Sequence, residues 1–354
     1  MASGPIKGRG AITNRASRYN ATSVEPDAAA EAESAPDTRV SEEHARSIIS
    51  TNRSPDIPFD RSINPYRGCE HGCIYCYARP THAYLGLSPG LDFETQLVVK
   101  RNATERLLEE LGRKDYRCQP IALGANTDPY QPIERVYRST RSLLEVLNDC
   151  GHPVIITTKS ALIERDLDLL TAMAERRLAE VQLSITTMDR HLARVLEPRA
   201  AAPARRLETM QTLAMAGVPV RLLVAPIIPF VNDSELDDLI ATAARHGAQA
   251  ASYVVLRLPL EIKDLFREWL EAHFPLRARR VLACLSEMHG GQLYDARFGR
   301  RQHGTGIFAE LLKQRFAVAL RKSGLRHELP GLATEHFRPP RKDPMQTDLF
   351  ASED

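Results

Sequence analysis

The stretch Asn64-Pro65-Tyr66-Arg67-Gly68-Cys69-Glu70-His71-Gly72-Cys73-Ile74-Tyr75-Cys76-Tyr77 places three cysteines at C-x3-C-x2-C spacing, interleaved with two glycines. Glycine adopts backbone conformations that other residues avoid, so the loop can turn all three thiolates toward one point. Three thiolates can hold three irons of a [4Fe–4S] cube and leave the fourth iron open to another ligand. No fourth cysteine comes before Cys118, and an open iron indicates chemistry rather than electron storage alone.

Two other uses of these cysteines are weaker. Six cysteines in 354 residues, without a secretory signal, do not indicate a disulfide framework and favour a reducing cytoplasm. A zinc site is the alternative, with His71 or His82 as a fourth ligand. Zinc ligands usually come as two paired knuckles, however, and the sequence has no second one. The spacing therefore favours an iron–sulfur cluster at Cys69, Cys73 and Cys76.

The same motif, with Tyr75 directly before the last cysteine, resembles the cluster motif of the radical SAM superfamily. The resemblance implies that the open iron binds the amino and carboxylate groups of S-adenosylmethionine. It also implies that an external one-electron donor, of the flavodoxin or ferredoxin type, reduces the cluster. Reductive cleavage of the sulfonium would then give a 5′-deoxyadenosyl radical, which abstracts a hydrogen atom from a substrate.

The composition is that of an ordinary soluble protein, with 43% hydrophobic and 26% charged residues. No apolar run approaches the roughly 18 residues that a membrane span requires. The net charge of +2 neither demands nor excludes nucleic acid as a partner. We therefore expect a cytoplasmic protein that does not enter the membrane.

Composition and periodicity divide the chain into four parts. Residues 1–55 are poor in large apolar side chains, and we expect a mostly disordered tail. Residues 56–275 form the core domain, and residues 276–330 a mainly helical extension. Residues 331–354 are expected to be a flexible tail.

Within residues 56–275, short β-branched or apolar runs alternate with helical patterns, which favours a parallel sheet. Periodicity alone does not separate a doubly wound sheet from an incomplete barrel. The resemblance implies an α/β fold with the partial (β/α)6 barrel of radical SAM enzymes. The expected strands are residues 62–66, 97–100, 121–123, 154–158, 181–186, 220–225 and 252–256.

Polar residues follow successive strands of this pattern. Ligands of parallel β/α folds bind where the strands end, so these side chains are expected to surround one site. For any single Ser, Thr or Asp the ordinary explanation is a turn or a helix cap. The recurrence of such residues favours a binding site. Its candidate residues outside the cysteine motif are Asn126, Asp128, Lys159, Ser184, Thr186, Glu197 and Arg206.

These motifs resemble the spore photoproduct lyase branch of the superfamily, often described as DNA repair photolyase-like. The resemblance covers about residues 59–269 and implies a role for several residues. Lys159 would lie near the carboxylate of S-adenosylmethionine, Tyr75 near its adenine and Ser184 near its ribose. Tyr77 and Asp128 would line the mouth of the active site and are the catalytic candidates.

One position departs from the lyase pattern. The lyases have a cysteine three residues before the aspartate, which returns a hydrogen atom to the product radical. Here that position is Ala125, and alanine has no weak bond to hydrogen that it could donate. The same route to spore photoproduct repair would require Cys118, Cys150 or a tyrosine in its place. The sequence therefore supports the class of enzyme and not that particular reaction.

Two further stretches bear on partners. Gln346-Thr347-Asp348-Leu349-Phe350 resembles the short peptide by which bacterial DNA-acting proteins bind the sliding clamp, with Gln346, Leu349 and Phe350 as anchors. The Gly/Arg-rich residues 298–306 could either cradle a phosphate or serve as a connector.

The sequence leaves three functions to compare. The first is a radical SAM enzyme acting on nucleic acid, and the second is the same chemistry on RNA, protein or a metabolite. The third is a non-catalytic zinc or iron–sulfur DNA-binding module tethered to the clamp. Only an enzyme requires Lys159, Ser184 and Asp128 to converge near the cluster.

Overall fold

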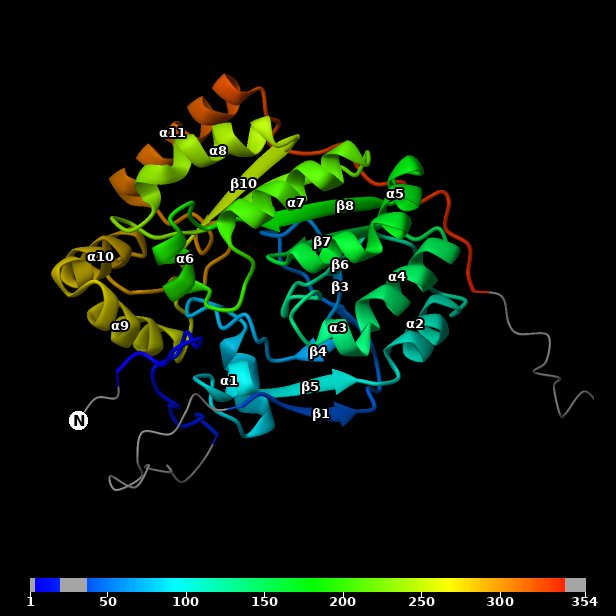
Figure 1. Cartoon of the computed structure of the whole chain (residues 1–354), viewed down its shortest axis with the longest axis horizontal. Helices are drawn as coiled ribbons and strands as arrows, with labels where there is room; N and C mark the ends of the chain where they lie inside the picture. The colour runs from blue at the N-terminus through cyan, green and yellow to red at the C-terminus, as the bar shows by residue number, and fades with distance from the viewer. Residues whose placement is uncertain (1–3, 20–36, 341–354) are drawn as a thin grey trace, which may run out of the picture.

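The computed structural model describes residues 4–19 and 37–340. Its centre is a seven-stranded sheet with the strand order β10-β9-β8-β7-β6-β3-β2 (Figure 1). All neighbouring pairs are parallel except β2, which runs antiparallel to β3. The strands are β2 (Ile49–Thr51), β3 (Arg61–Ile63), β6 (Ile121–Leu123), β7 (Val154–Thr158), β8 (Ala179–Ser184), β9 (Val220–Ile227) and β10 (Ala250–Val255).

The strand order resolves the choice that periodicity left open. In a doubly wound sheet the order reverses at a switch point. Here the parallel strands follow one another in chain order from β3 to β10, as they do in a barrel. The sheet is not closed, because β10 and β2 remain its two edges. An open, barrel-like α/β sheet is therefore the architecture.

The strands owe their position to β-branched and aliphatic residues. In β7, Val154 lies opposite Ile121 of β6 and Ala179 of β8, and all three side chains are fully buried. Strands covered on both faces tolerate such continuous apolar runs. Burial of β-branched side chains thus fixes the register at the middle of the sheet.

Helices connect the strands and cover the outer face of the sheet (Figure 1). The α-helices are α1 (Asp92–Thr95), α2 (Ala103–Leu111), α3 (Glu134–Tyr137), α4 (Ser139–Asp149), α5 (Leu167–Glu175), α6 (Arg190–Leu196), α7 (Pro203–Met215), α8 (Leu236–Arg245), α9 (Ile262–His273), α10 (Pro275–Met288) and α11 (Gly306–Ser323). Short 3₁₀ helices are η1 (Arg79–Leu85), η2 (Ala161–Asp166) and η3 (Asp233–Glu235). The helices α10 and α11 lie in the region after the core that is expected to be mainly helical.

The strand expected at residues 62–66 is two strands in different sheets. β3 joins the large sheet, whereas β4 (Tyr66–Arg67) pairs with β5 (Gln96–Lys100) in a small sheet of order β1-β5-β4. Pro65 lies between them and has no N–H for a continuing ladder. The chain therefore leaves the large sheet just before the cysteine loop.

The expectation of a mostly disordered tail over residues 1–55 is wrong for its described parts. β1 (Arg39–Glu43) pairs with β5, and β2 pairs with β3. The Glu110 carboxylate accepts hydrogen bonds from the backbone N–H groups of Ile48 and Ile49 at 2.7 and 3.1 Å. Composition misses this order because a few buried side chains, such as Ile48, and backbone hydrogen bonds to distant carboxylates hold it.

The expected flexible tail is also wrong for residues 331–338. The N–H of Ala333 donates to the carbonyl of Arg177 at 2.9 Å, and that of Arg338 to the carbonyl of Cys150 at 2.8 Å. Arg177 precedes β8 and Cys150 precedes β7, so this segment crosses the amino ends of the strands. The clamp-like residues 346–350 lie outside the described part of the chain.

Residues 299–302 bridge the two open edges of the sheet. The carbonyl of Gln302 accepts a hydrogen bond from Val255 of β10 at 2.8 Å. Arg301 Nε and the N–H of Gly299 donate to Asp56, in the β2–β3 connection, at 2.6 and 2.7 Å. Arg301 is thus occupied by Asp56, which favours a connector over a phosphate cradle.

Among the helices of residues 4–19 and 37–340, none combines the length and the apolar character that crossing a membrane requires.

Candidate active site

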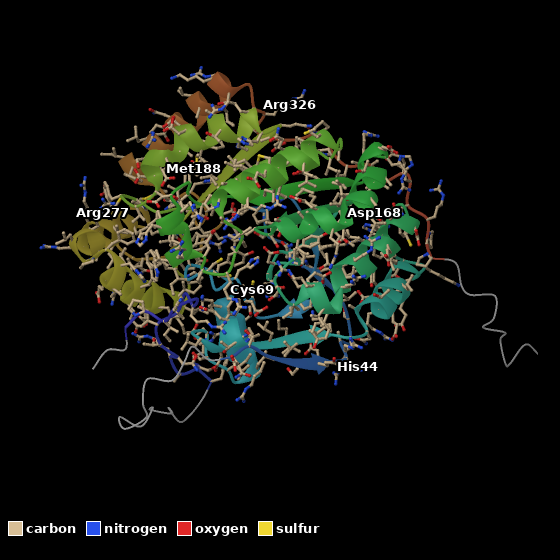
Figure 2. The ribbon with its side chains drawn as sticks, viewed as in Figure 1. His44, Cys69, Asp168, Met188, Arg277 and Arg326 are labelled. Carbon is tan, nitrogen blue, oxygen red and sulfur yellow. The ribbon has the colours of Figure 1, made fainter. Side chains whose placement is uncertain are left out.

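The cysteine loop lies against α1, where the N–H of Cys69 donates to the carbonyl of Phe93 at 2.9 Å. Figure 2 labels Cys69 near the middle of the view, beside that helix. Gly68 and Gly72 have φ values of 74° and 66°, and a Cβ on Gly72 would lie 2.7 Å from the Glu94 carboxylate. Glycine is therefore required at Gly72 both by the backbone and by the close approach.

A buried ion pair holds the loop from one side. Arg79 and Glu94 are both fully buried and form a salt bridge. Arg79 also donates from Nε to the carbonyl of Cys73 at 2.9 Å, and from its terminal nitrogen to that of Gly72 at 3.1 Å. A buried guanidinium with several acceptors fixes the backbone between two cysteines.

Residues 9–18, here called the amino-terminal segment, lie beside α1 and α9 (Figure 1) and contact the cysteine loop. The Glu94 carboxylate accepts hydrogen bonds from the N–H groups of Gly10 and Ala11 at 3.0 and 2.8 Å. A Cβ on Gly10 would lie 1.8 Å from the carbonyl oxygen of Gly72. Sequence reasoning missed this support, because no local pattern links residues more than 80 positions apart.

The Gly10→Ala variant is expected to separate the amino-terminal segment from the cysteine loop, because its methyl group overlaps a backbone carbonyl. We expect a loss of about 1–3 kcal/mol in the free energy of unfolding and faster loss of iron from reconstituted protein in air. The matched control is Gly4→Ala, since a Cβ on Gly4 meets no atom within 4 Å. Equal stability and equal iron retention in the two variants would show that the contact with Gly72 has no effect.

The cysteines fit a metal cluster in their chemistry. Burial raises the pKa of Cys73 to about 12 and that of Cys69 well above its ordinary value. Buried thiols of this kind become thiolates only when a cation neutralises them. Within residues 4–19 and 37–340, no three Cys, His, Asp or Glu side chains are grouped closely enough to share one metal ion. A four-iron cluster does not require such a group, because each cysteine ligates its own iron.

The candidate zinc ligands each have another partner. His71 Nδ1 lies 3.2 Å from Asp128 Oδ2, and His82 Nε2 lies 2.8 Å from the carbonyl oxygen of Gln96. Each contact engages one ring nitrogen of the histidine. The structure thus gives both histidines a role in positioning the loop.

A buried network surrounds the Tyr75 hydroxyl, which donates to the Glu197 carboxylate. Thr186 Oγ1 donates to the same carboxylate at 2.6 Å, and Arg206 forms a fully buried ion pair with it. Burial alone would raise the pKa of Glu197, but Arg206 and Lys159 lower it to about 2. Glu197 is therefore ionised and anchors the group.

Two more of the expected residues reach this network. Lys159 Nζ lies 5.8 Å from the centre of the Tyr75 ring. Burial would lower the pKa of Lys159, but Cys73 and Glu197 raise it above its ordinary value, so the ammonium stays charged. Ser184 Oγ donates to the carbonyl of Ala225 at 3.3 Å, and the carbonyl of Ser184 accepts from Arg206 at 2.9 Å.

Asp128 joins two strand ends to the cysteine loop. Its carboxylate accepts hydrogen bonds from Thr158 Oγ1 at 2.7 Å and from the N–H of Lys159 at 2.8 Å, besides its contact with His71. Burial would raise the pKa of Asp128, but His71 and these hydrogen bonds lower it to about 2. The geometry gives Asp128 a positioning role.

Tyr77 and Asn126 lie at the same edge of the sheet, with other contacts. The Tyr77 hydroxyl donates to the carbonyl of Ala125, while its ring is half exposed. The backbone N–H of Asn126 donates to Asn64 Oδ1 at 2.8 Å. Asn126 is thus held through its backbone N–H group, and this contact is separate from the Tyr75 network.

The fold and the site together define a known class of protein. Residues 63–243 match the family model of the radical SAM superfamily, and the chain belongs to that superfamily. Its members use a [4Fe–4S] cluster and S-adenosylmethionine, and the protein is a radical SAM enzyme.

Relatives extend across several groups of organisms. An uncharacterized protein of Mycobacterium tuberculosis is 35% identical over 268 residues, which span 75% of each chain. An uncharacterized protein of Methanocaldococcus jannaschii is 31% identical over 173 residues, 49% of this chain and 62% of its own. A protein of Pseudomonas phage M6 named radical SAM Nalpha-GlyT isomerase is 24% identical over 54% of this chain and 38% of its own.

Among solved structures, spore photoproduct lyase complexed with dinucleoside spore photoproduct has a similar fold. The TM-score is 0.55 at 16% sequence identity, and the match covers 80% of this chain and 79% of the lyase. The lyase variant with bound AdoMet and dinucleoside spore photoproduct gives the same TM-score at 17% identity. The architecture expected from the cysteine motif is thereby supported.

Proposed function

We propose that this radical SAM enzyme abstracts a hydrogen atom from a nucleic acid substrate. The observation that supports catalysis most directly is the buried group of Tyr75, Lys159, Glu197 and Arg206 beside the cysteine loop. A binding module has no use for charged side chains buried in this way, since each costs desolvation. The nucleic acid is inferred from the solved lyase complex with a dinucleoside photoproduct.

In this proposal the residues of the chain have the following roles. Cys69, Cys73 and Cys76 hold the cluster, and Lys159 binds the carboxylate of S-adenosylmethionine. Tyr75 lies by the adenine and Ser184 by the ribose. When bound, the cluster and S-adenosylmethionine supply a 5′-deoxyadenosyl radical.

The three remaining cysteines do not replace the donor absent at Ala125. Cys118 and Cys150 precede β6 and β7, at the amino ends of the strands, and Cys284 lies in α10. The candidate site is at the opposite, carboxyl ends. The proposed reaction therefore differs from that of the lyases in how the product radical is quenched.

The test is an anaerobic assay of the reconstituted wild-type protein. Iron and sulfide are counted, S-adenosylmethionine and dithionite are added, and 5′-deoxyadenosine is measured. Dithionite stands in for a flavodoxin- or ferredoxin-type donor, which we propose to reduce the cluster in the cytoplasm. Four irons with 5′-deoxyadenosine would support the function. Bound zinc without 5′-deoxyadenosine would contradict it.

A second assay compares substrate classes. Single-stranded DNA, RNA or a peptide is added, and the rate of 5′-deoxyadenosine formation is measured for each.

The Lys159→Ala variant is expected to bind S-adenosylmethionine about 10- to 100-fold more weakly, since a hydrogen bond to a charged group contributes roughly 1.5–3 kcal/mol. Isothermal titration of reconstituted protein measures this. Iron content should not change, because Lys159 is not a ligand. The exposed Lys263 in α9 provides the control Lys263→Ala. Unchanged affinity in Lys159→Ala would remove the assigned role.

A further inference from the structure

An arginine between two tyrosines lies at the mouth of the site. The guanidinium of Arg257 is 5.4 Å from the centre of the Tyr77 ring and 5.9 Å from that of Tyr294. Arg257 also donates to the Tyr294 hydroxyl at 3.4 Å. Tyr77 directly follows the ligand Cys76, so these three side chains, here called the aromatic platform, adjoin the cluster loop.

The platform spans the carboxyl edge of the sheet. Arg257 follows the end of β10, while the Tyr77 hydroxyl is bonded to Ala125, which follows the end of β6. β6 and β10 are separated by three other strands in the sheet. Tyr77 of the platform is exposed at this edge, whereas Tyr75 is buried.

The charge of Arg257 is not neutralised by a carboxylate. The ion pairs found among the described residues do not include Arg257, and its buried Nε has no hydrogen-bond partner there. This differs from Arg79 and Arg206, which both pair with glutamates. An arginine that faces rings rather than a carboxylate keeps its positive charge available for a ligand.

The platform is also half open to solvent. The Tyr77 side chain is 49% exposed, although tyrosine is a residue that usually gains from burial. Tyr294 lies in the connection between α10 and α11. Residues 299–302 of the same connection are hydrogen-bonded to β10 and to Asp56, which holds the connection in place. An exposed ring on a fixed support is preorganised for stacking, because little further ordering is needed on binding.

We propose that Tyr77, Arg257 and Tyr294 form a nucleobase-binding platform. A base of a single strand stacks on an open tyrosine face, and Arg257 donates to a base carbonyl or to the adjoining phosphate. This inference rests on the nucleic acid substrate of the proposed function. It adds Arg257 and Tyr294, which the motifs did not indicate, to Tyr77, and it places substrate entry on the side of β10.

The test uses two fluorescein-labelled probes of equal length and phosphate charge. One is a single-stranded oligothymidylate, and the other is an abasic oligonucleotide. Fluorescence anisotropy with the full reconstituted chain should show tighter binding of oligothymidylate. Tyr294→Ala should weaken that binding by roughly ten-fold or more, the effect of losing one base–aromatic stack, and leave the abasic probe unchanged.

Three variants make the result specific. Tyr294→Phe keeps the ring and should bind as the wild type does, which separates loss of stacking from loss of folding. Arg257→Met should weaken oligothymidylate binding as well. Phe298→Ala is the matched control, since it removes an exposed ring of the same connection, one that Arg301 covers at 4.8 Å. It should not change binding.

Equal affinity of the wild type for the two probes, or an unaltered Tyr294→Ala variant, would overturn the platform. The formation of 5′-deoxyadenosine without substrate is independent of both outcomes. Formation of 5′-deoxyadenosine without base-dependent binding would therefore reject the platform and keep the radical chemistry. Base-dependent binding without 5′-deoxyadenosine would reject the chemistry and keep the platform.

Discussion

The Cys73→Ala variant is expected to lose the [4Fe–4S] cluster and, with it, all detectable formation of 5′-deoxyadenosine. In the proposed site each of the three cysteines ligates one iron, and among the described residues no fourth cysteine lies in the loop to replace Cys73. The loop itself should persist, because Arg79 binds the backbone carbonyl of Cys73 and not its side chain. Iron and sulfide analysis after anaerobic reconstitution provides the measurement.

The control for this variant is Cys150→Ala. Cys150 is also buried, but it lies at the amino end of β7, across the sheet from the loop. It should retain four irons and form 5′-deoxyadenosine as the wild type does. A Cys73→Ala protein with full iron and sulfide content would exclude Cys73 as a ligand.

The Arg206→Met variant is expected to lower the free energy of unfolding by about 3–5 kcal/mol. Arg206 and Glu197 are each only 1% exposed, so removing the guanidinium leaves a carboxylate buried without its counter-charge. Methionine has a similar length and fills the space. Denaturant unfolding of the protein before reconstitution measures the loss.

The neighbouring arginine provides a matched control. Arg205 pairs with Glu164 at 2.7 Å, but its side chain is 41% exposed, and such surface pairs contribute about 0–1 kcal/mol. Arg205→Met should therefore have a small effect. Equal losses in the two variants would show that burial of the Glu197 pair has no special cost.

The difference between wild type and Arg206→Met should also depend on pH. In the wild type the pKa of Glu197 is lowered to about 2, so its stabilising effect persists until strongly acidic pH. In the variant, loss of Arg206 raises the pKa of Glu197 above its wild-type value, although Lys159 still lowers it. Protonation then relieves the buried charge, and the difference in stability between the two proteins should narrow as the pH falls from neutrality.

Local strand patterns could be predicted from the sequence, while their arrangement could not. β6 and β7 have the bounds expected from their short apolar runs. The strand order depends on contacts between distant residues, and it came only from the resemblance. Residues 62–66 were expected as one strand because Pro65 alone does not show that the chain changes sheets.

Some residues of the candidate site could likewise be identified from the sequence, and others could not. Lys159 and Glu197 could be identified because each follows a predicted strand, and Thr186 because it ends one. Such residues meet at one edge of the sheet. Arg257 follows β10 as well, but a single arginine after a strand has many ordinary explanations. Nothing in the sequence pointed to a role for Glu94, since its partners Gly10 and Arg79 come from separate parts of the chain.

The amino-terminal segment also constrains how the protein is completed during synthesis. Thr13 bonds to Glu268 at 2.7 Å and Arg18 to Glu261, across 255 and 243 residues of sequence. The ribosome must therefore make nearly the whole core, up to α9, before this segment can take its final place. Until then residues 13–18 cannot make these contacts on the nascent chain, whereas Gly10 and Ala11 require only Glu94. The part of the segment that touches the cysteine loop can thus take its place early, and the remainder is fixed only once α9 has been made.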